Sequence, residues 1–143
     1  MKKLITNTDP ISINAIGFLR IIVGAYFIMH GHEFFNQNAM LGFADYLRKD
    51  LGFPFPLFMA YLRTGAELFG GIMLVLGLFT RVGASLIMIT MLVASFTAGK
   101  GDLIGEGEFT FIYALFCIAF ILIGSGKFSL DNYFFNKESN STK

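Results

Sequence analysis

The sequence is poor in cysteine and in charged residues, and each shortage excludes a class of function. Cys117 is the one cysteine, so an internal disulfide, a CxxC dithiol and a thiolate metal site cannot form within one chain. Only 15% of the residues are charged, whereas a soluble domain carries about 25% because its surface must be wetted. The net charge of +1 and the lack of a basic stripe exclude nucleic acid as an electrostatically bound partner.

The sequence also lacks the motifs of common soluble enzymes. It has no glycine-rich phosphate loop after a strand, no HExxH helix and no serine elbow. It shows no internal repeat, and the inverted repeat and length usual in transporters are missing. The pattern therefore names no catalytic residue, so an enzyme and a binding protein both stay open.

Hydrophobic residues make up 55% of the chain and gather in four apolar stretches. A helix needs about 20 mostly apolar residues to cross about 30 Å of hydrocarbon. Continuous apolar runs without alternation favour helices over a barrel. We therefore predict an all-α bundle of four transmembrane helices, a single membrane domain over residues 1–136 followed by a disordered polar tail at 137–143. The predicted spans are 11–30, 57–79, 82–98 and 109–123.

The basic residues predict the orientation of the bundle. More of them fall on the side that holds both termini, so the positive-inside rule places both termini in the cytoplasm. The long joint at residues 32–56 is then external. Its apolar residues at 39–47 predict a short amphipathic helix lying on the membrane. The residues counted are Lys2, Lys3, Arg81, Lys127, Lys137 and Lys143 on one side, and Arg48, Lys49 and Lys100 on the other.

Three charged residues lie inside the apolar stretches, where an ionised side chain costs at least about 2.5 kcal/mol. Arg20 and Glu67 fall near the middle of antiparallel segments, so we predict that they form a buried ion pair. Arg63 is one helical turn from Glu67, so a triad with one unmatched positive charge is the next arrangement, and it offers a place for an anion or a polarised carbonyl. The alternative is that the ion pair only fixes the register of two helices.

Glycines predict where the first two helices touch, because small residues let helix backbones approach in lipid. One set recurs every seven residues and shares a face with Arg20, and the other shares a face with Glu67. We expect the two faces to meet. The first set is Gly17, Gly24 and Gly31, and the second is Gly70, Gly71 and Gly77.

Histidine gives no metal site by spacing. His30 and His32 point to opposite sides of a helix unless the helix ends between them at Gly31, so we expect no chelating pair and no bound metal. His30 instead hydrogen-bonds at the membrane interface or faces the bundle above Arg20 as a proton-handling group. Cys117 lies in an apolar run and is expected to be a small core residue.

Three fragments in order resemble the DoxX family of small bacterial membrane proteins. The first helix resembles the pattern R-x3-G-x2-F-x2-HG, with Arg20, Gly24, Phe27, His30 and Gly31. The next stretch resembles E-x2-GG…LGLxTRxxA, with Glu67, Gly70, Gly71, Leu76, Gly77, Leu78, Thr80, Arg81 and Ala84. The last resembles G-x-G-x-x-SLD, with Gly124, Gly126, Ser129, Leu130 and Asp131. The family usually has a lysine after the His-Gly pair, and Phe34 stands at about that position here.

The resemblance implies a four-helix bundle in the bacterial cytoplasmic (inner) membrane with both termini inside. Members of the DoxX family are linked to quinone or quinol oxidation, thiosulfate oxidation, oxidative-stress complexes and detoxification of catechols or quinones. Our first hypothesis is a redox-linked component that binds a quinone between the helices. In it, Arg20, Arg63 and His30 face the quinone oxygens and Glu67 handles charge or protons. Because the sequence shows no redox centre, a protein partner in the membrane is expected.

The second hypothesis is a non-catalytic accessory subunit that stabilises a larger membrane complex. The long outer joint would make the contact through Phe53, Phe55 and Phe58. A pocket lined by the charged cluster favours the first hypothesis, and a tightly packed cluster without a cavity favours the second.

Overall fold

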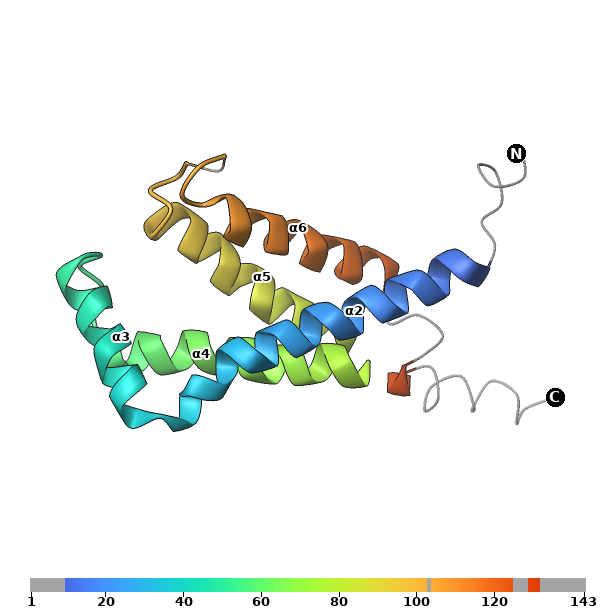
Figure 1. The fold of residues 1–143 in the computed structure, drawn as a ribbon, viewed down its shortest axis with the longest axis horizontal. Coiled ribbons are helices and arrows are strands. Elements are labelled where there is room, and N and C mark those ends of the chain that lie inside the picture. The colour runs from blue at the N-terminus through green and yellow to red at the C-terminus, as the bar shows by residue number, and fades with distance from the viewer. Residues whose placement is uncertain (1–9, 103, 125–128, 132–143) are drawn as a thin grey trace.

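The computed structural model describes residues 10–102, 104–124 and 129–131, and the described part of the chain is built from helices (Figure 1). This confirms the all-α fold class. Each of the four long apolar helices begins and ends within three residues of a predicted span. The elements are α2 (Pro10–Gly31), the 3-10 turn η1 (His32–Phe35), α3 (Gln37–Lys49), α4 (Pro56–Leu76), α5 (Thr80–Thr97) and α6 (Glu108–Ile123).

Helices α2, α4 and α5 are long and apolar enough to cross a membrane, and α6 is a shorter apolar helix of 16 residues. The chain is therefore a multi-pass membrane protein whose surface faces lipid. The cytoplasmic placement of both termini stays a prediction. The predicted tail at 137–143 and Gly126 lie outside the described residues.

Helix α4 is the centre of the bundle, because it packs against α2, α3 and α5. Helix α6 packs along α5, as Figure 1 shows. The main core lies between α2, α5 and α6 around Phe27, Ile87 and Phe120. Cys117 is fully buried in the same core, which confirms its role as a small apolar residue.

Glycines let α2 and α4 pack backbone to backbone. A Cβ atom added to Gly24 would lie 2.8 Å from the carbonyl oxygen of Gly71, and one added to Gly31 would lie 2.6 Å from the Cα atom of Leu68. Such distances are too short for any side chain. The predicted contact of the two glycine faces is therefore confirmed at Gly24, Gly31 and Gly71.

The other three glycines differ from one another in their surroundings. An added Cβ on Gly17 would meet nothing within 4 Å. Gly70 faces α5 instead of α2, because its added Cβ would lie 2.9 Å from the carbonyl oxygen of Gly83. Gly77 ends α4 with a φ of 65°, a left-handed conformation that favours glycine. The prediction was wrong at Gly70, because one apolar helix can offer small residues to several neighbours. Gly77 does lie against α2, since an added Cβ there would meet the guanidinium of Arg20.

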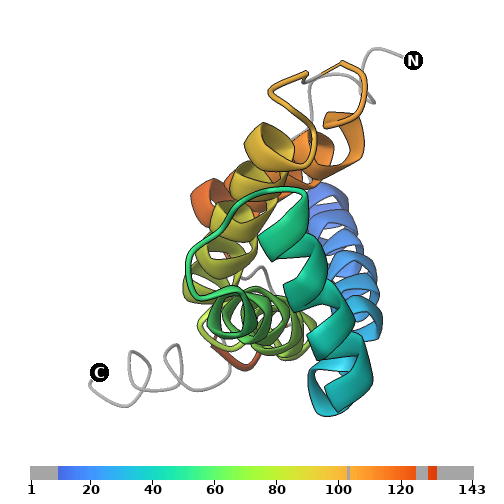
Figure 2. The same ribbon diagram turned by 90° about the vertical axis from the view of Figure 1, so that its left-hand side faces the viewer.

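The α4–α5 turn gives these two helices the shape of a V. Helix α5 begins at Thr80, directly after the turn at Gly77, and the contact of Gly70 with Gly83 holds the helices close near that turn. Farther from the turn they diverge, and α3 stands across the open end (Figure 1). Figure 2 looks at the molecule from that end, with α3 in front of the bundle.

Helix α3 is the predicted amphipathic helix, and it is longer than the predicted stretch at 39–47. It begins after Asn36, whose side chain accepts hydrogen bonds from the first turn. Its buried Met40, Ala44 and Leu47 pack against Ala60 of α4. Part of its apolar face is therefore covered by protein, whereas Leu41 at 48% and Tyr46 at 39% stay exposed. That α3 lies on the membrane stays a prediction.

Candidate functional site

The buried charges form two separate groups at different levels of the bundle. In the first group the Nε atom of Arg63 donates a hydrogen bond of 2.8 Å to Glu67 Oε1, one turn away on α4. The Glu67 side chain is buried and that of Arg63 is half-buried. His30 at the end of α2 and Glu33 of η1 interact electrostatically with the Glu67 carboxylate. The predicted contact of Arg63 with Glu67 is confirmed.

The predicted ion pair between Arg20 and Glu67 is wrong. Arg20 is 0% exposed, and its guanidinium lies against Gly77, where an added Cβ would meet it. Glu67 is ten residues from Gly77, which is about 15 Å along a helix. The register causes this separation, because Gly31 packs on Leu68 and places Glu67 level with the other end of α2.

Arg20 instead belongs to a group at the α4–α5 turn. Its Nη1 atom donates a hydrogen bond of 3.3 Å to Thr80 Oγ1, and it interacts electrostatically with Asp131. The Asp131 carboxylate accepts hydrogen bonds from the backbone N–H groups of Phe79 at 2.9 Å and Thr80 at 3.3 Å. The Asp131 N–H donates to the carbonyl oxygen of Gly77. This arrangement caps α5 and fixes residues 129–131 under the turn.

The predicted family-signature residues therefore have structural roles where the structure describes them. Ser129 lies beside Gly77 in the same group. Arg81 is exposed, with its guanidinium near Gly124. These contacts bring residues 77–80 and residues 129–131, which lie far apart in the chain, side by side in the structure.

Removal of the Asp131 side chain gives the first prediction. Asp131→Ala is expected to lower the free energy of unfolding by about 1–2 kcal/mol, because α5 loses its N-terminal cap and the buried Arg20 loses a nearby negative charge. Thermal unfolding in detergent measures this change. Asp45→Ala removes a carboxylate that pairs only with exposed Arg48 and Lys49, and it is expected to change stability by less than about 0.5 kcal/mol. Equal unfolding temperatures for the two variants would contradict the capping role.

His30 and His32 do not meet. His30 is exposed and its ring centre lies 4.5 Å from that of Tyr26. His32 follows the end of α2 and its Nδ1 atom contacts the carbonyl oxygen of Met29. Among the described residues no group of three or more His, Cys, Asp or Glu side chains is placed to hold a metal ion.

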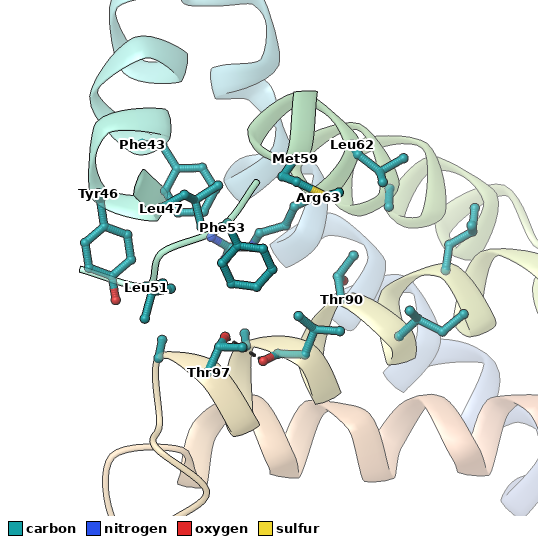
Figure 3. Close-up of a pocket in the computed structure, with 16 residues that line it drawn as sticks. Phe43, Tyr46, Leu47, Leu51, Phe53, Met59, Leu62, Arg63, Thr90 and Thr97 are labelled. Atoms are coloured by element: carbon teal, nitrogen blue, oxygen red, sulfur yellow. Dashed lines mark hydrogen bonds between the residues drawn. The ribbon is translucent and has the colours of Figure 1, made fainter. Parts of the chain in front are cut away.

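A pocket of about 290 Å³ lies between α4 and α5 at the open end of the V, and α3 forms one of its walls (Figure 3). We call it the α3–α4–α5 pocket. Its walls are almost entirely apolar. The aromatic, charged and hydroxyl-bearing residues among them are Phe43, Tyr46, Phe53, Arg63, Thr90 and Thr97. The sequence did not reveal this pocket, because it depends on the angle between two helices and on the position of a third.

Arg63 is the one charged residue that lines the pocket. Its Cζ atom lies 4.8 Å from the centre of the Phe43 ring, and in Figure 3 its side chain extends behind Phe53. Within the part of the chain that the structure describes, its one hydrogen bond is that from Nε to Glu67. A guanidinium has five N–H donors, so the two Nη groups have no hydrogen-bond partner among the described residues.

The two threonines differ from Arg63, because their hydroxyl protons are already used. Thr90 donates to the carbonyl oxygen of Ile87 at 2.8 Å, and Thr97 donates to that of Val93 at 2.7 Å. Among the described lining residues, the donors that these bonds leave are the charged guanidinium of Arg63 and the hydroxyl of Tyr46, in an otherwise apolar pocket. Of the four residues in the predicted cluster, Arg63 lines the pocket. Glu67 accepts the hydrogen bond from Arg63 Nε. Arg20 and His30 do not line the pocket.

The sequence was also compared with those of known families and proteins. A family model described as DoxX matches residues 15–100, more than half of the chain. A Haemophilus influenzae protein named "Uncharacterized protein" is 36% identical over 131 residues, which cover 85% of this chain and 92% of that protein. A Bacillus subtilis protein named "Putative oxidoreductase CatD" is 33% identical over 123 residues, which cover 85% of this chain and 88% of that protein. No solved structure matches the chain.

Proposed function

Because this chain belongs to the DoxX family, we propose that it is a redox-linked component of the bacterial inner membrane that binds a quinone in the α3–α4–α5 pocket. The observation that carries the proposal is the position of Arg63, a cation with unused donors at the wall of an apolar pocket. The name of the Bacillus subtilis relative, which describes an oxidoreductase, agrees with redox chemistry.

The chemistry of the pocket suits a ring with carbonyl oxygens. Hydrogen bonds from a guanidinium to an oxygen are about twice as strong as those between neutral groups. Phe43 and Phe53 offer ring faces and edges to an aromatic or quinonoid ring. The volume of about 290 Å³ is near the lower end of small-molecule sites, about 300–1,000 Å³, which fits one or two fused rings.

Glu67 makes an arginine tolerable at this depth. An unpaired cation in the hydrocarbon region is costly. The hydrogen bond that Arg63 Nε donates to Glu67 Oε1 pairs this cation with a carboxylate and fixes the plane of the guanidinium. The Nη groups are then held toward the ligand. A quinone carries electrons itself, so we propose that a protein partner in the membrane delivers or accepts them.

The test is a binding measurement with menadione, a naphthoquinone without a tail. We expect Arg63→Leu to weaken its binding by about tenfold or more, because the strongest donor is lost. Ala66→Phe fills the pocket from α4 and is expected to abolish binding. Equilibrium dialysis of the detergent-purified protein gives both affinities.

The matched control is Arg81→Leu, because Arg81 is exposed and does not line the pocket. It is expected to bind menadione as the unaltered protein does. The quinone proposal fails if Arg63→Leu and Ala66→Phe keep the unaltered affinity while they remain folded.

A second candidate function is the accessory subunit. Phe55 and Phe58 are exposed at the end of the bundle near α3, which favours a contact with another protein there. Phe53, the third residue of the expected contact, lines the pocket instead. If this surface binds a partner, Phe55→Ala with Phe58→Ala is expected to reduce the size of the native complex on a detergent gel and to leave menadione binding unchanged.

A further inference from the structure

The α3–α4–α5 pocket reaches the lipid-facing surface of the protein between α4 and α5. Five residues both line the pocket and lie exposed. Two of them are Tyr46 of α3 and Ala98, which follows the last residue of α5. The other three are Leu62 at 55%, Ile89 at 56% and Val93 at 47%. All three belong to helices that are long and apolar enough to span a membrane. We call the surface that they surround the lateral opening.

The lateral opening lies within the hydrocarbon region. Leu62 is six residues from the start of α4 and Ile89 is eight residues from the end of α5, which places them about 9 and 12 Å inside the helix ends. A hydrocarbon core of about 30 Å is matched by helices of this length. Acyl chains, and not head groups or water, therefore border the opening.

Another wall of the pocket is formed by α3 and the segment that follows it. The labelled residues of this wall include Phe43, Leu47 and Phe53 (Figure 3). The guanidinium of Arg63 lies on the Phe43 side of the pocket. A bound molecule with one polar end is thus oriented, with its oxygens at Arg63 and its apolar end at the lateral opening.

We propose that the ligand enters sideways from the bilayer and carries a hydrocarbon tail that remains in the lateral opening while the ring occupies the pocket. This inference rests on the proposed function and narrows its ligand class to tailed, membrane-dissolved quinones. A polar ligand from water would meet three large aliphatic side chains and acyl chains at that opening. An isoprenoid or alkyl tail matches both.

The experiment compares two probes that share one ring. Menaquinone-4 has the naphthoquinone ring of menadione and adds an isoprenoid tail. Binding of both is measured in phosphatidylcholine nanodiscs for the full chain and for Ile89→Trp, which places a large ring in the lateral opening. We expect Ile89→Trp to weaken menaquinone-4 binding by about tenfold more than it weakens menadione binding, because only the tailed probe must occupy the lateral opening. Val93→Trp is a second variant at the same opening and is expected to behave alike.

The matched control is Ile118→Trp, an exposed position on α6 away from the pocket, and it is expected to bind both probes normally. The inference is overturned if Ile89→Trp and Val93→Trp weaken both probes equally or weaken neither. If neither probe binds the unaltered protein, the proposed function itself fails and the inference falls with it. The two failures are therefore distinguishable.

Discussion

Arg20→Leu is expected to reduce the free energy of unfolding by about 3–5 kcal/mol, the range for removal of one partner from a buried charged group. Arg20 is fully buried, donates to Thr80 and faces the charge of Asp131. Leucine fills much of the space but removes the hydrogen bond to Thr80 and the positive charge near Asp131. The yield of monodisperse protein in detergent and its unfolding temperature measure the effect.

A double substitution separates this structural group from the pocket. Arg20 and Glu67 have different partners, so Arg20→Leu and Glu67→Leu are expected to have additive effects, within about 0.5 kcal/mol. If the double variant were more stable than Arg20→Leu alone, the result would instead support a direct ion pair between Arg20 and Glu67. Arg20→Lys keeps the charge without the planar fork, and we expect an intermediate loss.

Gly31→Ala is expected to have the second largest effect, because α2 and α4 are in backbone contact there. The added methyl group would lie 2.6 Å from both the Cα atom and the backbone nitrogen of Leu68. Backbone atoms cannot move aside as a flexible side chain does, so the two helices must separate. Overpacking of this kind costs about 1–3 kcal/mol, and occasionally more. Thermal unfolding in one detergent, with and without the substitution, measures it.

Gly17→Ala is the matched control on the same helix. Its added Cβ would meet no atom of the described residues within 4 Å. Alanine is also a better helix former than glycine by about 0.5–1 kcal/mol. We expect unchanged or slightly higher stability. If Gly31→Ala and Gly17→Ala gave the same unfolding temperature, the close approach of α2 and α4 would be refuted.

The sequence predicted the helices well because their lengths follow from local properties. An apolar run either is or is not long enough for the hydrocarbon core, and the observed ends fall within three residues of those expected. The pair of Arg63 and Glu67 was equally predictable, since residues four apart on a helix are neighbours. Gly24, Gly31 and Gly71 were identified by their spacing, because only small residues permit close helix contact.

The remaining site could not be predicted because it depends on how separate helices are aligned. Counting from the ends of apolar stretches placed Arg20 and Glu67 at one depth, but the glycine contacts set a different register. Arg20 interacts with Thr80 and Asp131, which follow it by 60 and 111 positions in the chain. The pocket arises from the angle between α4 and α5. The small Gly70 and Gly83 near the shared turn were the one available signal for that angle.

Photo-crosslinking in lipid vesicles tests the central claim most directly. A photoreactive naphthoquinone with an isoprenoid tail is bound, activated by light and located on the protein by mass spectrometry of its peptides. We expect labels on α3, on α4 around Arg63 and on α5 around Thr90, and we expect Arg63→Leu to remove them. Labels spread over the lipid-facing surfaces of α2 and α6, and unchanged by Arg63→Leu, would contradict quinone binding in this pocket.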